Sequence, residues 1–472
     1  MEIIIAEAIS TIPIYNDDYK KLYHTRALDK SSEKFKIVNK ILDSFPVSCF
    51  LKINEYLSNY LNNLDPLVIV TDWSDPTELI GLRLESNGKI IDYPNLCFIA
   101  FYTNWDNIEA SGIEDIFAHE LSHMWLSNMG FDFALSSSNK FHTCTAITDR
   151  YLAFSEGFAE HLEIVTKEMK INSMQEIELW DHAFDVDAWL CIRDSQLRIH
   201  AVKNNRFIYQ TAVPYEEDFD TYQHLHMAHI TSSAFTPERL KNGLQMMSCE
   251  GVIASFFYQL YKKEISKNST ITQQIYDCFG IESSGVSPLI KLYIKILYVI
   301  SRIDLKKETL MTDFVKAYGE CFPEEREEVI NIFTKVTHFS TVDYDAKELF
   351  GHMYRVARRG NIEEVKRELN NLNMIKNNLN ASILKGEIEL DAAIYSSIWI
   401  EGDKEITPIP WESEKKEKYY FDINAATEVD FYSFNNLSFK QCCKLVSIRE
   451  EVKGFLNIEE FNTKMSEIKM SY

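Results

Sequence analysis

Residues 113–130 read IEDIFAHELSHMWLSNMG and contain HELSH at residues 119–123. A helix completes one turn in about 3.6 residues, so His119 and His123, four positions apart, lie on one helix face. Apolar residues recur around them with a helical period, acidic residues fall in the first turn, and Gly130 marks the expected end. The stretch therefore predicts a helix that presents two imidazoles side by side.

Two imidazoles on one face are suited to bind Zn²⁺, because imidazole nitrogen is a good zinc donor. A catalytic zinc takes three protein ligands and a water, whose pKa falls toward about 7. Glu120 directly follows His119. Its carboxylate can take the proton of that water and later deliver it to the leaving amine. The spacing predicts Glu120 as the general base of a zinc hydrolase.

A second segment supplies the missing ligand. Residues 150–163 read RYLAFSEGFAEHLE, and their apolar positions follow a loose helical period, which Gly157 weakens slightly. On this helix Glu156, 33 positions after His123, is the expected third zinc ligand. Glu160 lies one turn further on the same face. We expect it to accept a hydrogen bond from the outer nitrogen of a liganding histidine, which fixes the tautomer of the ring.

At these residues the chain resembles a known family. HExxH followed by a helix with Ser-Glu-Gly-Phe-Ala at residues 155–159 is similar to the gluzincin metallopeptidases, most of all to the aminopeptidase N branch. The resemblance covers about residues 90–170 and extends more weakly to about 300. It implies zinc on His119, His123 and Glu156, with Glu120 as general base.

The chain differs from that branch at three points. The branch typically has Asn where Ser155 stands, and its gap before the third ligand is shorter. It also has a Gly-x-Met-Glu-Asn strand, whose Glu binds the free amino terminus of the substrate. Residues 95–104 read NLCFIAFYTN and hold no acidic residue, although they can form an edge strand beside which a peptide lies. Cutting of chain ends and internal cutting therefore both stay open.

A tetrahedral intermediate also needs an oxyanion donor, which is commonly worth roughly 3–4 kcal/mol. In the resembling enzymes a downstream Tyr or His has this role. The candidates are Tyr215, Tyr222, which lies 66 positions after Glu156, and His226, which lies in a cluster with His224 and His229. The cluster also suits a second metal, or consists of ordinary surface and part-buried histidines.

Composition limits the partners. The 472 residues carry 49 basic and 71 acidic side chains, a net charge of −22. This charge argues against nucleic acid and anionic membranes, which attract basic surfaces. The first residues lack the pattern of a signal peptide, and no apolar run reaches the roughly 20 residues of a membrane span. Nine scattered cysteines without a CxxC motif fit a reduced, cytoplasmic protein.

The order of the patterns predicts an α+β chain. Residues 66–71 and 96–102 read as strands of a small antiparallel sheet. Helices are expected at residues 48–61, 250–263, 288–303 and 324–336. We expect an N-terminal α/β region at residues 1–110, a zinc catalytic domain at 111–270, a helical domain at 271–400, a polar linker at about 401–418 and a small helical module at 415–472.

Residues 420–465 resemble the helix-hairpin-helix module of bacterial competence DNA receptors. In that module a Gly-hydrophobic-Gly hairpin presents backbone N–H groups to a phosphate. Here the hairpin, residues 434–438, reads FNNLS and has neither glycine. We therefore expect a module that docks a protein partner or presents a substrate, rather than one that binds DNA. A plain helical tail is the alternative.

The leading hypothesis is a zinc peptidase that acts on a peptide or protein. The second is a non-peptidase hydrolase on the same zinc scaffold, and the third is a binding protein that keeps a structural zinc. Glu120 argues against the third, because structural zinc sites are closed by four ligands and need no general base.

Overall fold

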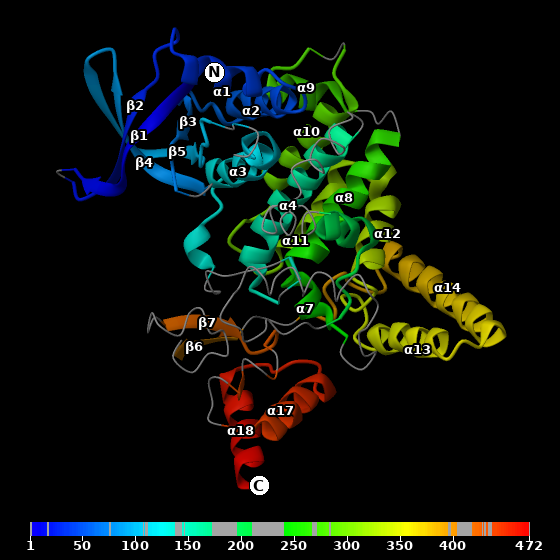
Figure 1. The fold of residues 1–472 in the computed structure, drawn as a ribbon. Helices are drawn as coiled ribbons and strands as arrows, with labels where there is room; N and C mark the ends of the chain where they lie inside the picture. Colours follow the sequence, from blue (N-terminus) through cyan, green and yellow to red (C-terminus); the bar gives the residue numbers. More distant parts are fainter. Residues whose placement is uncertain are drawn as a thin grey trace. The chain divides into compact units, whose positions relative to one another are not determined.

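Figure 1 shows the elements of the chain in a computed structural model. The chain divides into two compact units. Unit 1 holds residues 1–132, 158–178 and 261–305, and unit 2 holds residues 133–157, 179–260 and 306–472. The structure describes residues 2–16, 18–74, 77–106, 108, 112–136, 144–145, 147–171, 196–209, 240–266, 271–282, 285–394, 398–403, 418–426, 428, 431–432 and 437–471. Each unit is thus assembled from three separate segments of the chain.

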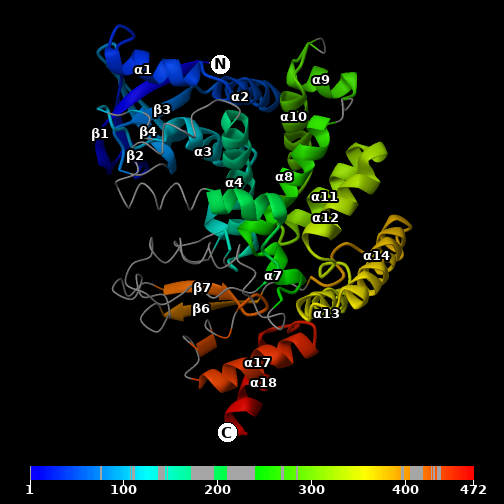
Figure 2. The same cartoon turned by 45° about the vertical axis from the view of Figure 1, so that its right-hand side comes forward.

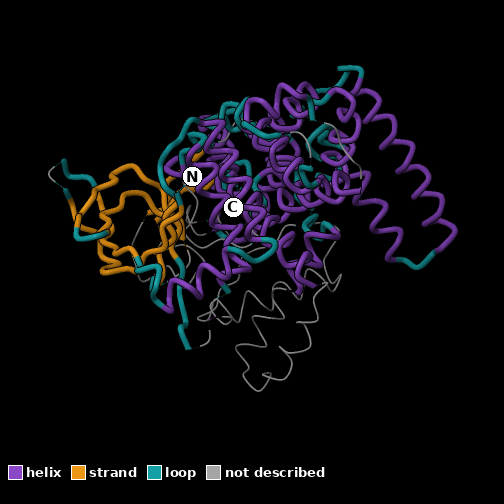
Figure 3. Tube along the Cα trace, turned by 90° about the horizontal axis from the view of Figure 1, so that it is seen from above, coloured by secondary structure: helices purple, strands orange, loops and turns teal. Residues whose placement is uncertain are grey.

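Unit 1 begins with a closed barrel, the orange ring of Figure 3. Its strands are β1 (Ile3–Tyr15), β2 (Lys21–Ala27), β3 (Leu67–Thr71), β4 (Thr77–Ser86) and β5 (Lys89–Ala100), in the order β1-β2-β4-β5-β3. Val68, Val70 and Phe98 are fully buried in its core. Asn87 and Gly88 join β4 to β5 with positive φ angles of 51° and 74°. Such an Asn-Gly turn has the twist that a tight hairpin requires.

The barrel has a mixed sheet, so the expectation of antiparallel pairing was wrong for part of it. β1 pairs with β2 and β4 with β5 in antiparallel fashion, whereas β1–β3, β2–β4 and β3–β5 are parallel. The two predicted strands are β3 and the end of β5. Ile99 pairs with both Glu78 and Ile69, so this part of β5 is not the open edge that we expected for a bound peptide. The α+β class itself is confirmed.

The helices of unit 1 have clear local causes. They are α1 (Glu33–Leu42), α2 (Val47–Leu61), α3 (Ile113–Asn128), α9 (Gln273–Phe279) and α10 (Pro288–Ile300), with the later part of α4 (Arg150–Ile171). Ser32 and Ser287 each accept a hydrogen bond from a backbone N–H of the first turn, as good N-caps do. Asn62 ends α2 in the left-handed conformation. α2 packs against both α3 and α10.

Unit 2 is mainly helical in its described part. It contains α7 (Gly243–Met247), most of α8 (Glu250–Ser266), α11 (Leu310–Cys321), α12 (Arg326–Val336), α13 (Ala346–Arg358) and α14 (Ile362–Leu384), and the short 3-10 helices η2 (Phe133–Leu135) and η5 (Pro323–Glu325). α13 packs against α14, and α11 against α12 (Figure 2). The predicted helices at residues 48–61, 250–263, 288–303 and 324–336 are all confirmed as α2, α8, α10 and α12, apart from a few end residues.

The C-terminal part of unit 2 contains β6 (Trp399–Asp403), β7 (Lys418–Asp422), α17 (Phe439–Glu451) and α18 (Ile458–Met470). β6 and β7 form an antiparallel pair at the two ends of the predicted linker, most of which lies outside the described residues. Phe431, Phe455 and Phe461 fill the core between the helices. The expected hairpin also falls mainly outside the described part, at residues 434–436.

Glu450 of α17 ties this module to the rest of unit 2. Its carboxylate accepts hydrogen bonds from Tyr344 (2.5 Å), Lys347 (2.7 Å) and Asn242 (3.0 Å). The neighbouring cations Lys347 and Arg449 hold the pKa of Glu450 at about 2, although its burial acts in the opposite direction. The module is therefore held to α13 by a part-buried charge pair between Glu450 and Lys347.

A search of the helices over the described residues finds none with both the length and the apolar character to cross a membrane.

Candidate metal centre

α3 carries the two histidines, and its ends match the sequence pattern. Gly112 precedes the helix with a φ of 62°, and Glu114 and Asp115 fall in the first turn, where acids favour the positive end of the helix dipole. The helix ends at Asn128, and Gly130 follows with a φ of 92°. His119 and His123 lie one turn apart, with ring centroids 5.0 Å from each other. The predicted helix and the shared face of its two histidines are confirmed.

Buried packing holds α3 in place. The indole N–H of Trp125, a fully buried residue, donates to Oδ1 of Asn54 on α2 at 3.0 Å. On the barrel side, the ring of Phe117 stacks on that of Phe101 with centroids 6.1 Å apart. An unmet indole donor at such a depth would cost about 1–3 kcal/mol. These contacts fix the rotation of the helix, and so the direction of its histidine face.

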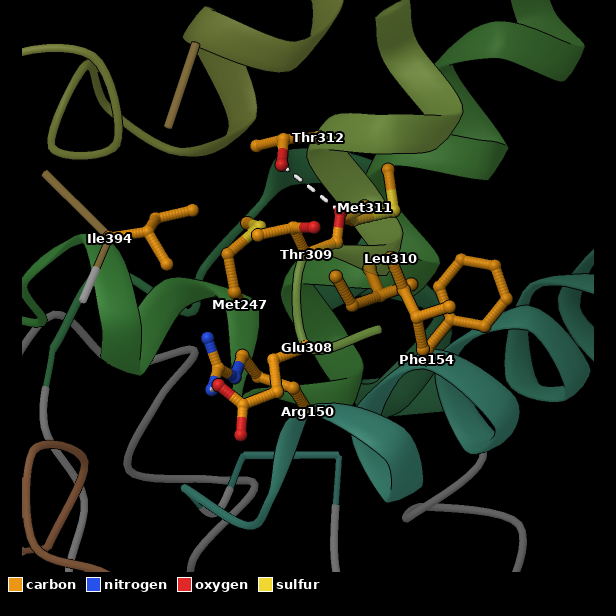
Figure 4. Close-up of a pocket in the computed structure, with 10 residues that line it drawn as sticks. Arg150, Phe154, Met247, Glu308, Thr309, Leu310, Met311, Thr312 and Ile394 are labelled. Carbon is orange, nitrogen blue, oxygen red and sulfur yellow. Dashed lines mark hydrogen bonds and ion pairs between the residues drawn. The ribbon is translucent and has the colours of Figure 1, made fainter. Parts of the chain in front are cut away.

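α4 is anchored at its beginning by polar contacts. Oδ1 of Asp149 accepts from the backbone N–H of Leu152 at 2.8 Å, as an N-cap does. Nη2 of Arg150 donates to Oε2 of Glu308 at 3.0 Å, and the hydroxyl of Tyr151 donates to the carbonyl of Lys306 at 2.7 Å. Figure 4 shows Arg150 and Glu308 facing each other. The helix then runs unbroken from Arg150 to Ile171.

Gly157 allows α4 and α8 to approach closely. A Cβ at this position would lie 2.5 Å from Cβ of Ile253 and 2.7 Å from the carbonyl oxygen of Glu250. Real Cβ atoms do not come so near, so only glycine fits. The glycine that weakens the helix pattern in the sequence is thus required by tertiary packing.

His119, His123 and Glu156 come together as a group that can hold a metal ion. One ligand atom from each lies within 4.8 Å of the other two. His123 is buried, and the His119 side chain is 17% exposed. Glu156 lies one turn before Glu160 on the same unbroken helix, so the helix itself sets its position. Glu120 is also buried, at 6% exposure. The three predicted ligands are therefore gathered, with the predicted base beside the first of them.

The sequence reasoning missed Glu163. Its Oε2 lies 3.6 Å from Nδ1 of His119, and Glu160 shares a second group of three with these two residues. Oε1 of Glu163 accepts a hydrogen bond from Nζ of Lys167. The signal was present, because Glu163 follows Glu156 by seven positions, two turns on the same face. The role of Glu160 as the outer carboxylate stays a prediction.

His161 lies on α4 and belongs to the core rather than to the metal group. It is fully buried, and the hydroxyl of Tyr293 lies 3.2 Å from its Nε2. Burial lowers the pKa of His161 to about 3, so the ring is neutral. This neutral pair helps to fix the helix that carries Glu156 and Glu163.

The predicted oxyanion donors Tyr215, Tyr222 and His226 lie outside the described residues, as do His224 and His229. Their roles stay predictions. A small pocket in unit 2, lined by Arg150, Phe154, Met247 and neighbouring residues, has a volume of about 10 Å³ (Figure 4). That volume is near the minimum for one water molecule. None of the three proposed metal ligands, His119, His123 and Glu156, lines this pocket.

No protein-family model matches the chain, and no similar curated protein or solved structure was found.

Proposed function

We propose that this protein is a zinc-dependent peptidase of the gluzincin type, in which His119, His123 and Glu156 bind the metal and Glu120 is the general base. One observation carries the proposal. Two histidines of α3 and a glutamate of α4 have their ligand atoms within 4.8 Å of one another, and Glu120, which follows His119 in the sequence, is buried without belonging to this group of three.

The donor set fits zinc better than the other common divalent ions. Two imidazoles and one carboxylate are a recurrent ligand set of catalytic zinc, whereas Mg²⁺ and Ca²⁺ prefer oxygen ligands throughout. The group provides three protein ligands. Catalytic zinc keeps its fourth position for water or substrate, and structural zinc is usually closed by four protein ligands. The chemistry of the donors thus favours a catalytic site.

When bound, zinc supplies a Lewis acid that acidifies water and polarises a carbonyl. The protein's own part in the reaction belongs chiefly to Glu120. Its carboxylate takes one proton from the attacking water as the new carbon–oxygen bond forms. It gives this proton to the amide nitrogen as the carbon–nitrogen bond breaks, which releases an amine and a carboxylic acid. Burial of Glu120 keeps competing water away from this transfer.

The test is cleavage of a peptide mixture with free and acetylated amino termini, followed by mass spectrometry. Wild type is compared with Glu120→Gln and with the control Glu114→Gln, which lies on the same helix and accepts a hydrogen bond from Ser44 (2.7 Å). We expect Glu120→Gln to bind zinc and lose about 100- to 10,000-fold in rate, as loss of a general base does. Glu114→Gln should cleave like wild type.

Two results would contradict the proposal. One is equal cleavage by Glu120→Gln and wild type. The other is a zinc-loaded wild type that cleaves no peptide, which would favour the non-peptidase hydrolase. The products of a positive result separate cutting at chain ends from internal cutting.

A further inference from the structure

We propose that Lys167 is a positioning residue for the metal centre, which acts through Glu163 on His119. The inference rests on the proposed zinc site and extends it by Lys167, which contacts Glu163 rather than belonging to the group of three proposed ligands. Lys167 is the outermost of three polar residues that follow one another in space, Lys167, Glu163 and His119, and all three lie within unit 1.

The geometry assigns each oxygen of Glu163 to a different neighbour. Oε2 lies 3.6 Å from Nδ1 of His119, and Oε1 accepts a hydrogen bond from Nζ of Lys167. A carboxylate is planar, so fixing one oxygen restricts the position of the other. The ammonium group of Lys167 therefore selects the side-chain conformation in which Glu163 faces His119. This contact leaves Nε2 as the nitrogen of His119 that is directed to a metal.

Burial explains why Glu163 needs this partner. Its side chain is 8% exposed, and the imidazole in front of it is neutral when it binds a metal. A buried carboxylate without a cation is costly and tends to turn toward water. Lys167 is 18% exposed, so its ammonium keeps some hydration while it offsets the charge of Glu163. The pair also has the favourable order on a helix, with Glu four positions before Lys.

The same contact argues against a second metal ion at His119, Glu160 and Glu163. These three residues can by their spacing hold a cation. However, Lys167 already places a positive charge on Glu163, and a dication beside it would be repelled. The group is better explained as an outer shell of carboxylates that orients a ligand of the first metal.

The experiment measures zinc affinity, so its result does not depend on any substrate. Apoprotein is titrated with zinc in competition with a chromophoric chelator, for wild type, Lys167→Met and Lys167→Arg. Lys262→Met is the matched control, because Lys262 pairs with Glu168 of the same helix at 3.2 Å. We expect Lys167→Met to weaken zinc binding roughly 3- to 10-fold, less than the 10- to 100-fold of a direct partner. Lys167→Arg should restore most of the affinity, and Lys262→Met should match wild type.

A double-mutant cycle separates positioning from a general loss of stability. Glu163→Gln alone should weaken zinc binding about 10- to 100-fold. If Lys167 acts only through Glu163, adding Lys167→Met to Glu163→Gln should change the affinity by less than about 2-fold. Thermal melts of the apoproteins show whether each variant folds. The absorption spectrum of the Co²⁺-loaded proteins reports the ligand geometry, and we expect it to shift in Lys167→Met alone among the three lysine variants.

The outcomes distinguish this inference from the proposed function. Unchanged affinity in a folded Lys167→Met, or full additivity in the cycle, overturns the role of Lys167 and leaves the zinc site intact. A wild type that binds zinc and shows the expected cycle, but cleaves no peptide, supports the inference and overturns the peptidase. A wild type that binds no zinc overturns both.

Discussion

Gly157 and Ile253 approach so closely that a Cβ on the glycine would lie 2.5 Å from Cβ of the isoleucine. The contact lies next to Glu156 in the sequence and joins α4 to α8. It links the stability of this helix pair to the position of the proposed third ligand.

We therefore expect Gly157→Ala to destabilise the protein by about 1–3 kcal/mol, the usual cost of overpacking, although alanine favours helices by about 1 kcal/mol. Zinc binding should weaken as well, because Glu156 shifts with the backbone. Urea unfolding and zinc titration measure the two effects. The control is Gly319→Ala in α11, where the nearest atom is Cγ of the flexible Arg326 side chain at 2.8 Å. That variant should lose less stability than Gly157→Ala, because the Arg326 side chain gives way more easily than the backbone carbonyl of Glu250, which Gly157 meets at 2.7 Å. Equal losses in both variants would contradict the packing argument.

Removal of the metal should abolish turnover without unfolding the chain. α3 and α4 are held by buried packing, such as the Trp125–Asn54 hydrogen bond and the His161–Tyr293 contact, rather than by the ligands alone. Circular dichroism of chelator-treated protein should show a cooperative melt with native helix content. Loss of that melt on chelation would instead support a structural zinc, since such sites supply folding energy outright.

Acid should destabilise the fold through His338 in unit 2. Burial, together with nearby lysines, lowers the pKa of His338 to about 3, and its Nε2 accepts a hydrogen bond from Asn205 at 3.2 Å. Below about pH 6.5 the imidazole of His338 binds a proton in the unfolded chain but stays neutral in the folded chain. Stability from this residue is thus constant above pH 6.5 and falls by about 1.4 kcal/mol per unit as the pH drops toward 3.

The check on His338 is denaturant unfolding at pH 7.5 and 5.5. We expect His338→Asn, which tolerates the left-handed φ of 50°, to reduce the loss between these two values by about 1.4 kcal/mol. An unchanged loss would assign the acid sensitivity to other groups.

Glu450 should control the attachment of the C-terminal helices. Glu450→Ala leaves the ammonium of Lys347, whose side chain is 10% exposed, without its carboxylate, which is 21% exposed. Removing one partner of such a part-buried pair costs more than the about 1 kcal/mol of a surface pair and less than the about 3–5 kcal/mol of a fully buried one. Limited proteolysis should then cleave near α17 and α18 faster than in wild type. Lys453→Met is the control, because its contact with Asp345 is exposed and 3.4 Å long. Surface pairs of that kind contribute about 0–1 kcal/mol.

Acid should loosen the same attachment in a lower pH range. The pKa of Glu450 is lowered to about 2, so its contribution is complete above pH 4.5 and is lost as the pH falls toward 2. At pH 3 the folded carboxylate is still mostly ionised, so proteolysis should be faster than at pH 7 but slower than that of Glu450→Ala. Equal proteolysis rates at pH 7 and pH 3 would contradict this role.

Local patterns were enough to predict the helices that carry the proposed metal ligands. Both helices and the shared face of His119 and His123 follow from a period of 3.6 residues and from end signals such as Gly130, which act within a few positions of the chain. The helices α2, α8, α10 and α12 were predictable for the same reason. The predicted oxyanion donors Tyr222 and His226 lie outside the described residues and stay predictions.

The tertiary structure decided what depends on distant partners. The alternation of apolar residues in a strand indicates which side chains face the core, but not which other strand is its hydrogen-bonded neighbour. The parallel pairing of β1 with β3, which two helices separate in the sequence, was therefore not predictable. The reason for a glycine at position 157 is its close contact with Ile253, which lies about a hundred positions away in the sequence. The sequence placed Glu156, Glu160 and Glu163 on one helix face, and only the packing of α4 beside α3 brought Glu163 to His119. Helix periodicity depends on residues that are close in the sequence. Which glutamate of one helix face contacts His119 depends instead on how two helices pack against each other.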